Sequence, residues 1–130
     1  MVSFSRARTT LLLGAAAAAL AGCGADDIVH LVRTAQARAG CVAEALAAPG
    51  WKRGAPGLHA AAARLGLPIA FIDAGALIAA QPRCPTRSIV AERETGVASV
   101  AEGTALAASG GRLLLARIAG GGATCALAGP

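Results

Sequence analysis

The fold is decided by the stretch TGVASVAEGTALAASG, residues 95–110. Its glycine-bearing turn leads into a helix that we expect to begin at Ser99 and to end at Gly110. Glu102 follows Ser99 by three residues, which is the spacing of a capping box, in which each side chain satisfies a backbone N–H at the helix start. The next run, residues 112–118, is apolar and has the length of a strand. Turn, capped helix and strand together predict one unit of a layered α/β domain.

Strands and helices are expected to alternate along the rest of the chain. We predict strands at residues 11–13, 41–48, 69–72, 89–91 and 123–128, the last pairing antiparallel with residues 112–118. Helices are predicted from Asp26 or Asp27 to Arg38, from Pro56 to Leu65, and in a short segment capped by Asp73. Residues 81–88, which contain two prolines, read as a loop. The predicted fold is a single three-layer α/β/α domain with a small mixed β-sheet over residues 11–130, preceded by a variable tail over residues 1–10.

Composition limits the classes of function. The chain has 130 residues, enough for one domain, and its hydrophobic fraction is 55% while aromatics make up only 2%, so we expect a core of small residues. Basic residues number 12 against 7 acidic, a net charge of +5. GC-rich coding by itself produces an alanine- and arginine-rich chain, so this charge need not reflect a partner. No basic cluster is interleaved with aromatics, so no nucleic-acid partner is expected.

Cysteine spacing bears on metal binding and on localisation. The four cysteines lie far apart without a C-x-x-C pair, and neither histidine stands at ligand spacing from them, so no metal site is predicted. Scattered thiols in an alanine-rich chain favour reduced cysteines and a cytoplasmic protein.

One alternative to a cytoplasmic location stays open. Arginines precede an apolar run over residues 11–20, and LAGC at residues 20–23 has the form of a lipoprotein cleavage box, which would anchor the protein through Cys23.

Several motifs resemble one known family in their order. The run TGVASVAE at 95–102, followed by Ala105-Leu106, is similar to the tGvaSVaEaaAL signature of the CobE/CbiG C-terminal domain family of cobalamin (vitamin B12) biosynthesis. Lys52 with PGL at 56–58 resembles the family's KxxEpgL element. Segments LGLP, PTRS and ATCA, at 65–68, 85–88 and 123–126, follow in family order, so the similarity covers about residues 25–128.

The chain departs from the family pattern at three places. Ala55 stands where the KxxE acid is expected, the glycine-rich opening strand is reduced to Leu13-Gly14 followed by alanines, and Arg117 replaces the usual lysine. These changes bear on any reaction or ligand that depends on the lost groups.

The resemblance implies an accessory protein similar to CobE. Such a protein binds a precorrin or corrin intermediate and assists its processing in the corrin ring pathway, without a cofactor and without catalysis of its own. Corrin-pathway methyltransferases are the protein partners that this role suggests, and a homodimer is left open. The enzymatic alternative is a hydrolase similar to CbiG, which opens the ring-A lactone of cobalt-precorrin-5A.

Candidate site residues follow from the chemistry of such a ligand. Corrin intermediates are broad macrocycles fringed with carboxylates, so a binder needs an apolar cleft with cations and N–H donors at its rim. In open α/β sheets this cleft lies beyond the carboxyl ends of the strands, where the segments 49–55, 81–88 and 95–99 would meet. The predicted binding residues are Lys52, Arg87, Ser88, Gly96, Val97, Ser99 and Arg117.

Each candidate also has a plain structural role to set beside the functional one. Glu102 is the one candidate for catalysis, and helix capping is its alternative. Ser99 has the same alternative. Lys52 is equally typical of a solvated loop charge. Arg87 and Ser88 lie in a stiff loop that suits a binding rim, and a plain connection is their alternative. Arg117 is also typical of a sheet edge.

Overall fold

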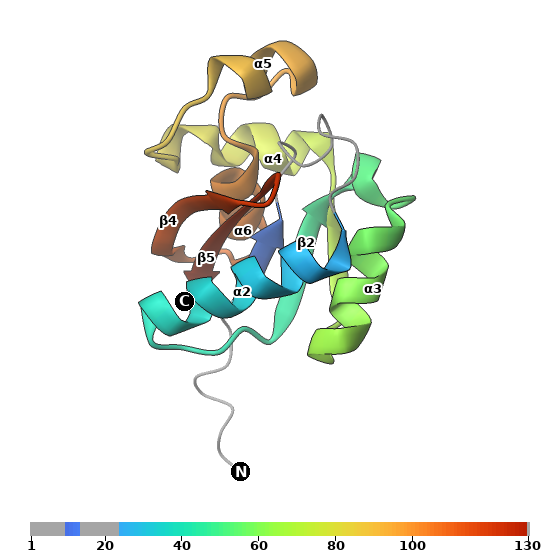
Figure 1. Ribbon diagram of the computed structural model, residues 1–130. Helices are drawn as coiled ribbons and strands as arrows, with labels where there is room; N and C mark the ends of the chain where they lie inside the picture. The colour runs from blue at the N-terminus through green and yellow to red at the C-terminus, as the bar shows by residue number, and fades with distance from the viewer. Residues whose placement is uncertain (1–9, 14–23, 130) are drawn as a thin grey trace.

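The computed structural model describes residues 10–13 and 24–129 of the chain. Within this part the strands form one mixed sheet in the order β3-β2-β1-β5-β4 (Figure 1). The strands are β1 (Thr10–Leu13), β2 (Ala45–Pro49), β3 (Ile69–Ile72), β4 (Arg112–Gly120) and β5 (Ala123–Gly129). The first three run parallel, whereas β5 lies antiparallel to both β1 and β4. The small mixed sheet and the antiparallel final pair predicted from the sequence are confirmed.

The helices lie on both faces of this sheet (Figure 1). They are α2 (Ala25–Ala39), α3 (Pro56–Leu65), α4 (Ala74–Ala80), α5 (Ile89–Thr95) and α6 (Val100–Ser109), with short 3-10 turns η2 (Gly50–Lys52) and η3 (Gln81–Arg83). Alternate strand residues face opposite ways. Leu46 and Ala48 of β2 therefore join the core beneath α2 and α3, while Ala47 between them joins the core beneath α4 and α6. Two cores separated by one sheet make the three-layer α/β/α domain that was predicted.

Local signals placed several of these boundaries correctly. Pro56 occupies the first turn of α3, and Gly66 ends that helix in the left-handed conformation at φ 69°. Asp73 caps α4 by accepting a hydrogen bond from the Ala76 N–H. The predicted aspartate cap of α2 is wrong, because the helix begins at Ala25 behind Gly24, whose position supplies no side-chain cap.

The predicted strand at residues 89–91 is also wrong. These residues open helix α5, which Ser88 caps by accepting a hydrogen bond from the Ala91 N–H at 3.1 Å. Ile89 and Val90 look like strand residues because they are β-branched and adjacent. They are 70% and 62% exposed, so no sheet or core holds them in an extended conformation.

Two sequence predictions fall on undescribed residues. The variable tail at residues 1–10 and the cleavage box at 20–23 lie largely or wholly outside the described ranges. Among the described residues, none of the helices combines the length and hydropathy needed to cross a bilayer.

Candidate functional site

The candidate site forms where helix α4 ends and helix α6 begins. The Gln81 side chain links the two, because its Nε2 donates to the Ser99 carbonyl at 2.8 Å and its Oε1 accepts from the Ser99 N–H at 3.0 Å. The same Nε2 also donates to the Leu77 carbonyl. Gly103 leaves the space for this arrangement, since a Cβ there would lie 2.5 Å from Gln81 Nε2 and 2.8 Å from Leu77 Cδ1.

A backbone hydrogen bond joins two of the three segments that were predicted to converge. The Ser88 N–H donates to the Ala98 carbonyl at 2.7 Å, so the end of the 81–88 segment is held against the 95–99 turn. Between these two residues lie helix α5, its closing glycine Gly96, at φ 87°, and Val97. The left-handed conformation explains why glycine stands at this position.

Glu102 lies at the centre of the site and is fully buried. Its Oε1 accepts from the Thr86 N–H at 2.9 Å and from the Ser99 hydroxyl at 3.0 Å. Its Oε2 accepts from the Thr86 hydroxyl at 2.7 Å and from the Arg117 N–H at 2.9 Å. One carboxylate thus holds the loop before α5, the start of α6 and strand β4 together.

These contacts replace the capping box predicted from the sequence, which is therefore wrong in its hydrogen bonds. Ser99 stands at the N-cap position of α6, but its hydroxyl makes no cap hydrogen bond and donates to Glu102 instead. The Ser99 N–H, which Glu102 would bind in a capping box, is bound by Gln81. The spacing of serine and glutamate was informative, and the tertiary partners of the two side chains decided their roles.

The surroundings of Glu102 favour a structural role over a catalytic one. Both oxygens already accept two hydrogen bonds each, and the side chain has no exposed surface. A general base must reach a substrate proton directly or through one water. The catalytic role of Glu102, and with it the hydrolase alternative, stays a prediction.

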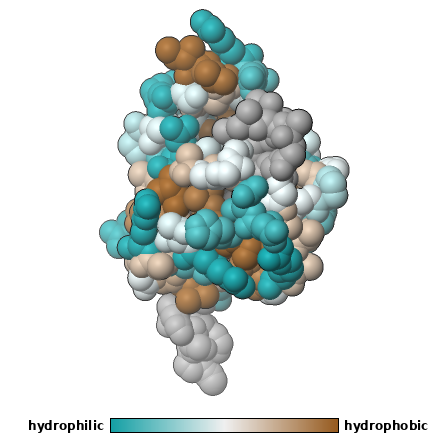
Figure 2. All heavy atoms as spheres, in the orientation of Figure 1, coloured by the Kyte–Doolittle hydropathy of each residue, from teal (hydrophilic) through white to brown (hydrophobic). Residues whose placement is uncertain are grey.

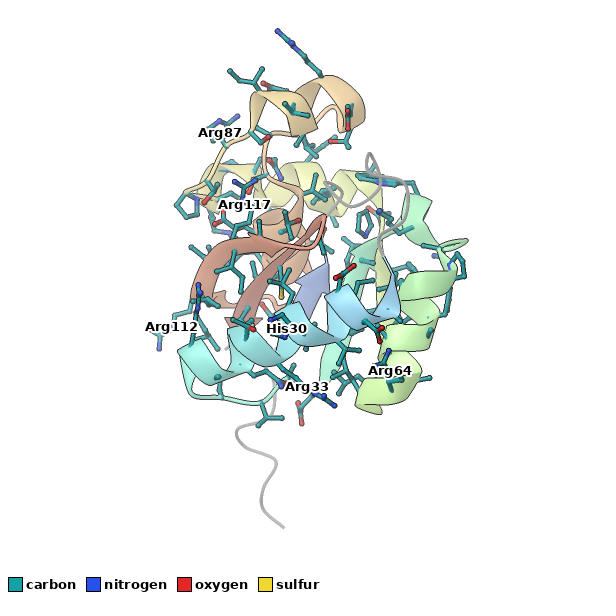
Figure 3. The ribbon with its side chains drawn as sticks, in the orientation of Figure 1. His30, Arg33, Arg64, Arg87, Arg112 and Arg117 are labelled. Atoms are coloured by element: carbon teal, nitrogen blue, oxygen red, sulfur yellow. The ribbon has the colours of Figure 1, made fainter. Side chains whose placement is uncertain are left out.

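The arginines near this carboxylate are placed through the backbone. Arg87 follows Thr86, and Arg117 itself donates its N–H to Glu102. Both side chains are exposed, and Figure 3 shows them at the end of the molecule that carries α5. Arg117 lies on β4, one of the two edge strands of the sheet, which fits its role as an edge residue, and its role as a rim cation stays a prediction.

An open pocket of about 410 Å³ lies beside this cluster. Its walls come from the end of α4 with η3, from α5, and from the turn before α6. The lining residues are Ile78, Gln81, Pro82, Arg87, Glu92, Gly96, Val97 and Ala98. Three predicted site residues, Arg87, Gly96 and Val97, therefore meet in one pocket. Exposed apolar side chains, Ile89 and Val90, also lie on α5, where Figure 2 shows an apolar patch.

Other predicted site residues lie outside the pocket lining. Lys52 ends η2, directly after the carboxyl end of β2, and is half-buried. Its neighbour Arg53 lies over the Phe71 ring at 4.6 Å from the centroid, a cation–π contact. Ser88 and Ser99 act through the hydrogen bonds described above.

Sequence reasoning missed Gln81, Thr86 and Glu92. Gly103 offered a signal, because a glycine inside a helix often marks a close approach of another element. A glutamine or threonine beside prolines offered none.

The buried thiols are held neutral. Burial raises the pKa of the Cys84 thiol, although its hydrogen bond with Ser99 acts in the opposite direction. Burial also raises the pKa of Cys125, to about 12. Among the described residues no three histidine, cysteine or acidic side chains gather as metal ligands would.

Comparison with known proteins settles the family. The family model described as Cobalamin synthesis G C-terminus matches residues 17–128. The chain belongs to this family. The match includes the pocket-forming segment between α4 and α6 and all strands of the sheet except β1, apart from the last residue of β5.

Two solved structures resemble the chain over most of its length. CobE, a protein from the cobalamin biosynthetic pathway, is 35% identical, with a TM-score of 0.78 over 92% of this chain and 89% of that one. The cobalamin biosynthesis protein chiG from Agrobacterium tumefaciens str. C58 is 30% identical, with a TM-score of 0.72 over 93% of this chain and 97% of that one. No match was found among curated protein sequences. This protein is therefore a cobalamin biosynthesis protein of the CobE and CbiG type.

Proposed function

We propose that this protein binds a precorrin or corrin intermediate of cobalamin biosynthesis by one edge of the macrocycle. Membership of the family supplies the pathway. The single observation that carries the proposal is the pocket in which Arg87 stands beside the Gly96–Ala98 turn and the apolar side chains of Ile78 and Pro82.

The size and chemistry of the pocket support this mode of binding. About 410 Å³ falls within the range of small-molecule sites, which is roughly 300–1,000 Å³, yet a whole corrin macrocycle with its side arms needs more room. The open pocket therefore suits one peripheral group and the ring edge that carries it. Apolar walls complement the ring, and the Arg87 guanidinium complements a peripheral group that accepts hydrogen bonds.

The position of Arg87 also supports the proposal. Its neighbour Thr86 donates two hydrogen bonds to the buried Glu102, so the backbone that carries the guanidinium is fixed before a ligand arrives. Preorganisation of this kind lowers the entropy lost on binding. We infer that the role of Glu102 is to position the rim of the site.

The test is a visible-absorbance titration of the purified protein with hydrogenobyrinic acid. We expect a saturable spectral shift from folded wild-type protein. Arg87→Ala should weaken binding about threefold to tenfold, the range for an exposed charge-assisted hydrogen bond. Arg93→Ala is the matched control, since Arg93 is an exposed arginine of α5 that does not line the pocket.

Two results would overturn the proposal. One is the absence of any spectral shift from folded wild-type protein. The other is equal weakening by Arg87→Ala and Arg93→Ala, which would show that net charge and not the pocket holds the ligand.

A further inference from the structure

We propose that Glu92 makes the pocket select a macrocycle edge that carries a primary carboxamide over one that carries a carboxylate. The inference rests on the proposed function, because it concerns which form of the ligand the same pocket prefers. It begins from one observation. Among the residues that the structure describes, the pocket is lined by one cation, Arg87, and one anion, Glu92.

The remaining lining residues provide no further charge. Ile78, Pro82 and Val97 are apolar, and the Gln81 amide is already bound to the backbone of Ser99 and Leu77. The charged side chains of the pocket therefore sum to zero. An anionic group gains from Arg87 and is opposed by Glu92, so net charge gives it little advantage.

Hydrogen-bond chemistry then decides which group fits. Arg87 only donates hydrogen bonds, and an ionised Glu92 only accepts them. A primary carboxamide has an oxygen that accepts and an NH₂ group that donates, so it satisfies both side chains at once. A carboxylate has acceptors alone, and it leaves Glu92 facing a like charge.

Hydrogen bonds hold the backbone segments that carry the two side chains. Glu92 donates its N–H to the Ser88 carbonyl at 3.0 Å, and its own carbonyl accepts from Gly96 at 2.9 Å. Arg87 lies between Ser88 and the Thr86 that Glu102 anchors. The backbone positions of Arg87 and Glu92 are therefore both held, through Ser88 and through the buried carboxylate that anchors Thr86.

The chain offers a matched control on the same helix. Glu94 is also an exposed glutamate of α5, but it does not line the pocket. Substitution of either glutamate by glutamine changes the net charge of the protein equally, so a difference between the two variants reports the pocket alone.

The experiment measures the affinities of wild type, Glu92→Gln and Glu94→Gln for two probes. One is hydrogenobyrinic acid, and the other is the same macrocycle with its peripheral carboxylates converted to primary carboxamides. Wild type should bind the carboxamide form about threefold to tenfold more tightly, as one additional exposed hydrogen bond allows. In Glu92→Gln the affinity for the acid should rise by a similar factor, because the repulsion is removed, while the amide oxygen of glutamine still accepts from the carboxamide. Glu94→Gln should keep the wild-type ratio.

The outcomes separate this inference from the proposed function. If both probes bind with equal affinity, or if Glu92→Gln and Glu94→Gln shift the ratio equally, the selectivity of Glu92 is overturned while macrocycle binding stands. If neither probe binds folded wild-type protein, the proposed function falls, and this inference falls with it.

Discussion

At the scale of single residues, Glu102 shows how one buried carboxylate can organise a site. Four donors from three separate segments converge on its two oxygens. Burial of a charge is costly unless hydrogen bonds compensate it, and here each oxygen receives two. The hydrogen bonds of Glu102 therefore hold the loop before α5 and strand β4 in place.

Glu102→Gln should destabilise the protein by about 1–3 kcal/mol, the usual cost of leaving a buried polar group without its partner. In either orientation the NH₂ group of glutamine would face a backbone N–H, that of Thr86 or that of Arg117, and it cannot accept a hydrogen bond from either. Urea unfolding followed by circular dichroism measures the change. Glu94→Gln, on an exposed part of α5, serves as the control. Equal stability of the two variants would contradict the role given to Glu102.

The buried thiols predict how stability depends on alkaline pH. Burial raises the pKa of Cys125 from 9.0 to about 12, so an unfolded chain releases this proton at a lower pH than the folded one. The contribution of this protonated thiol to the free energy of unfolding is fully present below pH 9. It is lost as the pH rises towards 12, by up to about 1.4 kcal/mol per pH unit. Cys84, whose pKa is also raised, adds to the same trend.

Urea unfolding between pH 8 and 10.5 tests this dependence with little interference. The chain contains no tyrosine and Lys52 is its only lysine, so few other groups titrate in that interval. Cys125→Ala should show a shallower loss of stability with pH than wild type. Identical slopes for the two proteins would mean that Cys125 ionises equally in the folded and unfolded states.

At the scale of elements, the α4–α6 contact depends on Gly103. Gly103→Ala should destabilise the protein by about 1–3 kcal/mol despite the higher helix propensity of alanine, because the new Cβ overlaps Gln81 and Leu77. Gly75→Ala in α4 is the control. A Cβ at Gly75 meets only an ordinary contact at 3.4 Å, so this variant should be neutral or slightly stabilised. Thermal unfolding of both variants makes the comparison. A Gly103→Ala protein as stable as wild type would show that α4 can shift without cost.

Elements whose ends carry local signals were predictable from the sequence. Proline at the start of α3, glycine at its end and aspartate before α4 act through their own backbone geometry. The strand predicted at residues 89–91 failed because apolar β-branched residues specify a strand only where a neighbouring strand or core receives them. Here Ile89 and Val90 are exposed, and the Ser88 cap favours a helix.

The segments that form the candidate site could be predicted from the sequence, but the side-chain hydrogen bonds between them could not. Arg87, Gly96 and Val97 were named in advance and line one pocket. The contacts of Gln81 with Ser99 span 18 residues of sequence, and those of Glu102 with Thr86 and Arg117 span 16 and 15. Such pairings arise from tertiary packing, so no spacing pattern along the chain encodes them.

At the scale of the whole molecule, alternation along β2 and β5 divides the chain into two cores on either side of one sheet. Alanines in both cores let the helices approach closely. With only 2% aromatic residues, the space between the elements could not be filled otherwise. The sheet and its helices support a pocket built from the segment between α4 and α6. The family match covers this segment and four of the five strands, all but β1.

The most direct test of macrocycle binding is a ¹⁵N-resolved NMR titration of the folded protein with hydrogenobyrinic acid. We expect the largest chemical-shift changes at the backbone amides of Gly96–Ala98 and at the side-chain amide of Gln81. Trp51, the only tryptophan, is not among the residues that line the pocket, so its indole N–H signal should change less. Saturable changes centred on Trp51 and η2 instead would contradict the placement of the site, and no change at any amide would contradict macrocycle binding itself.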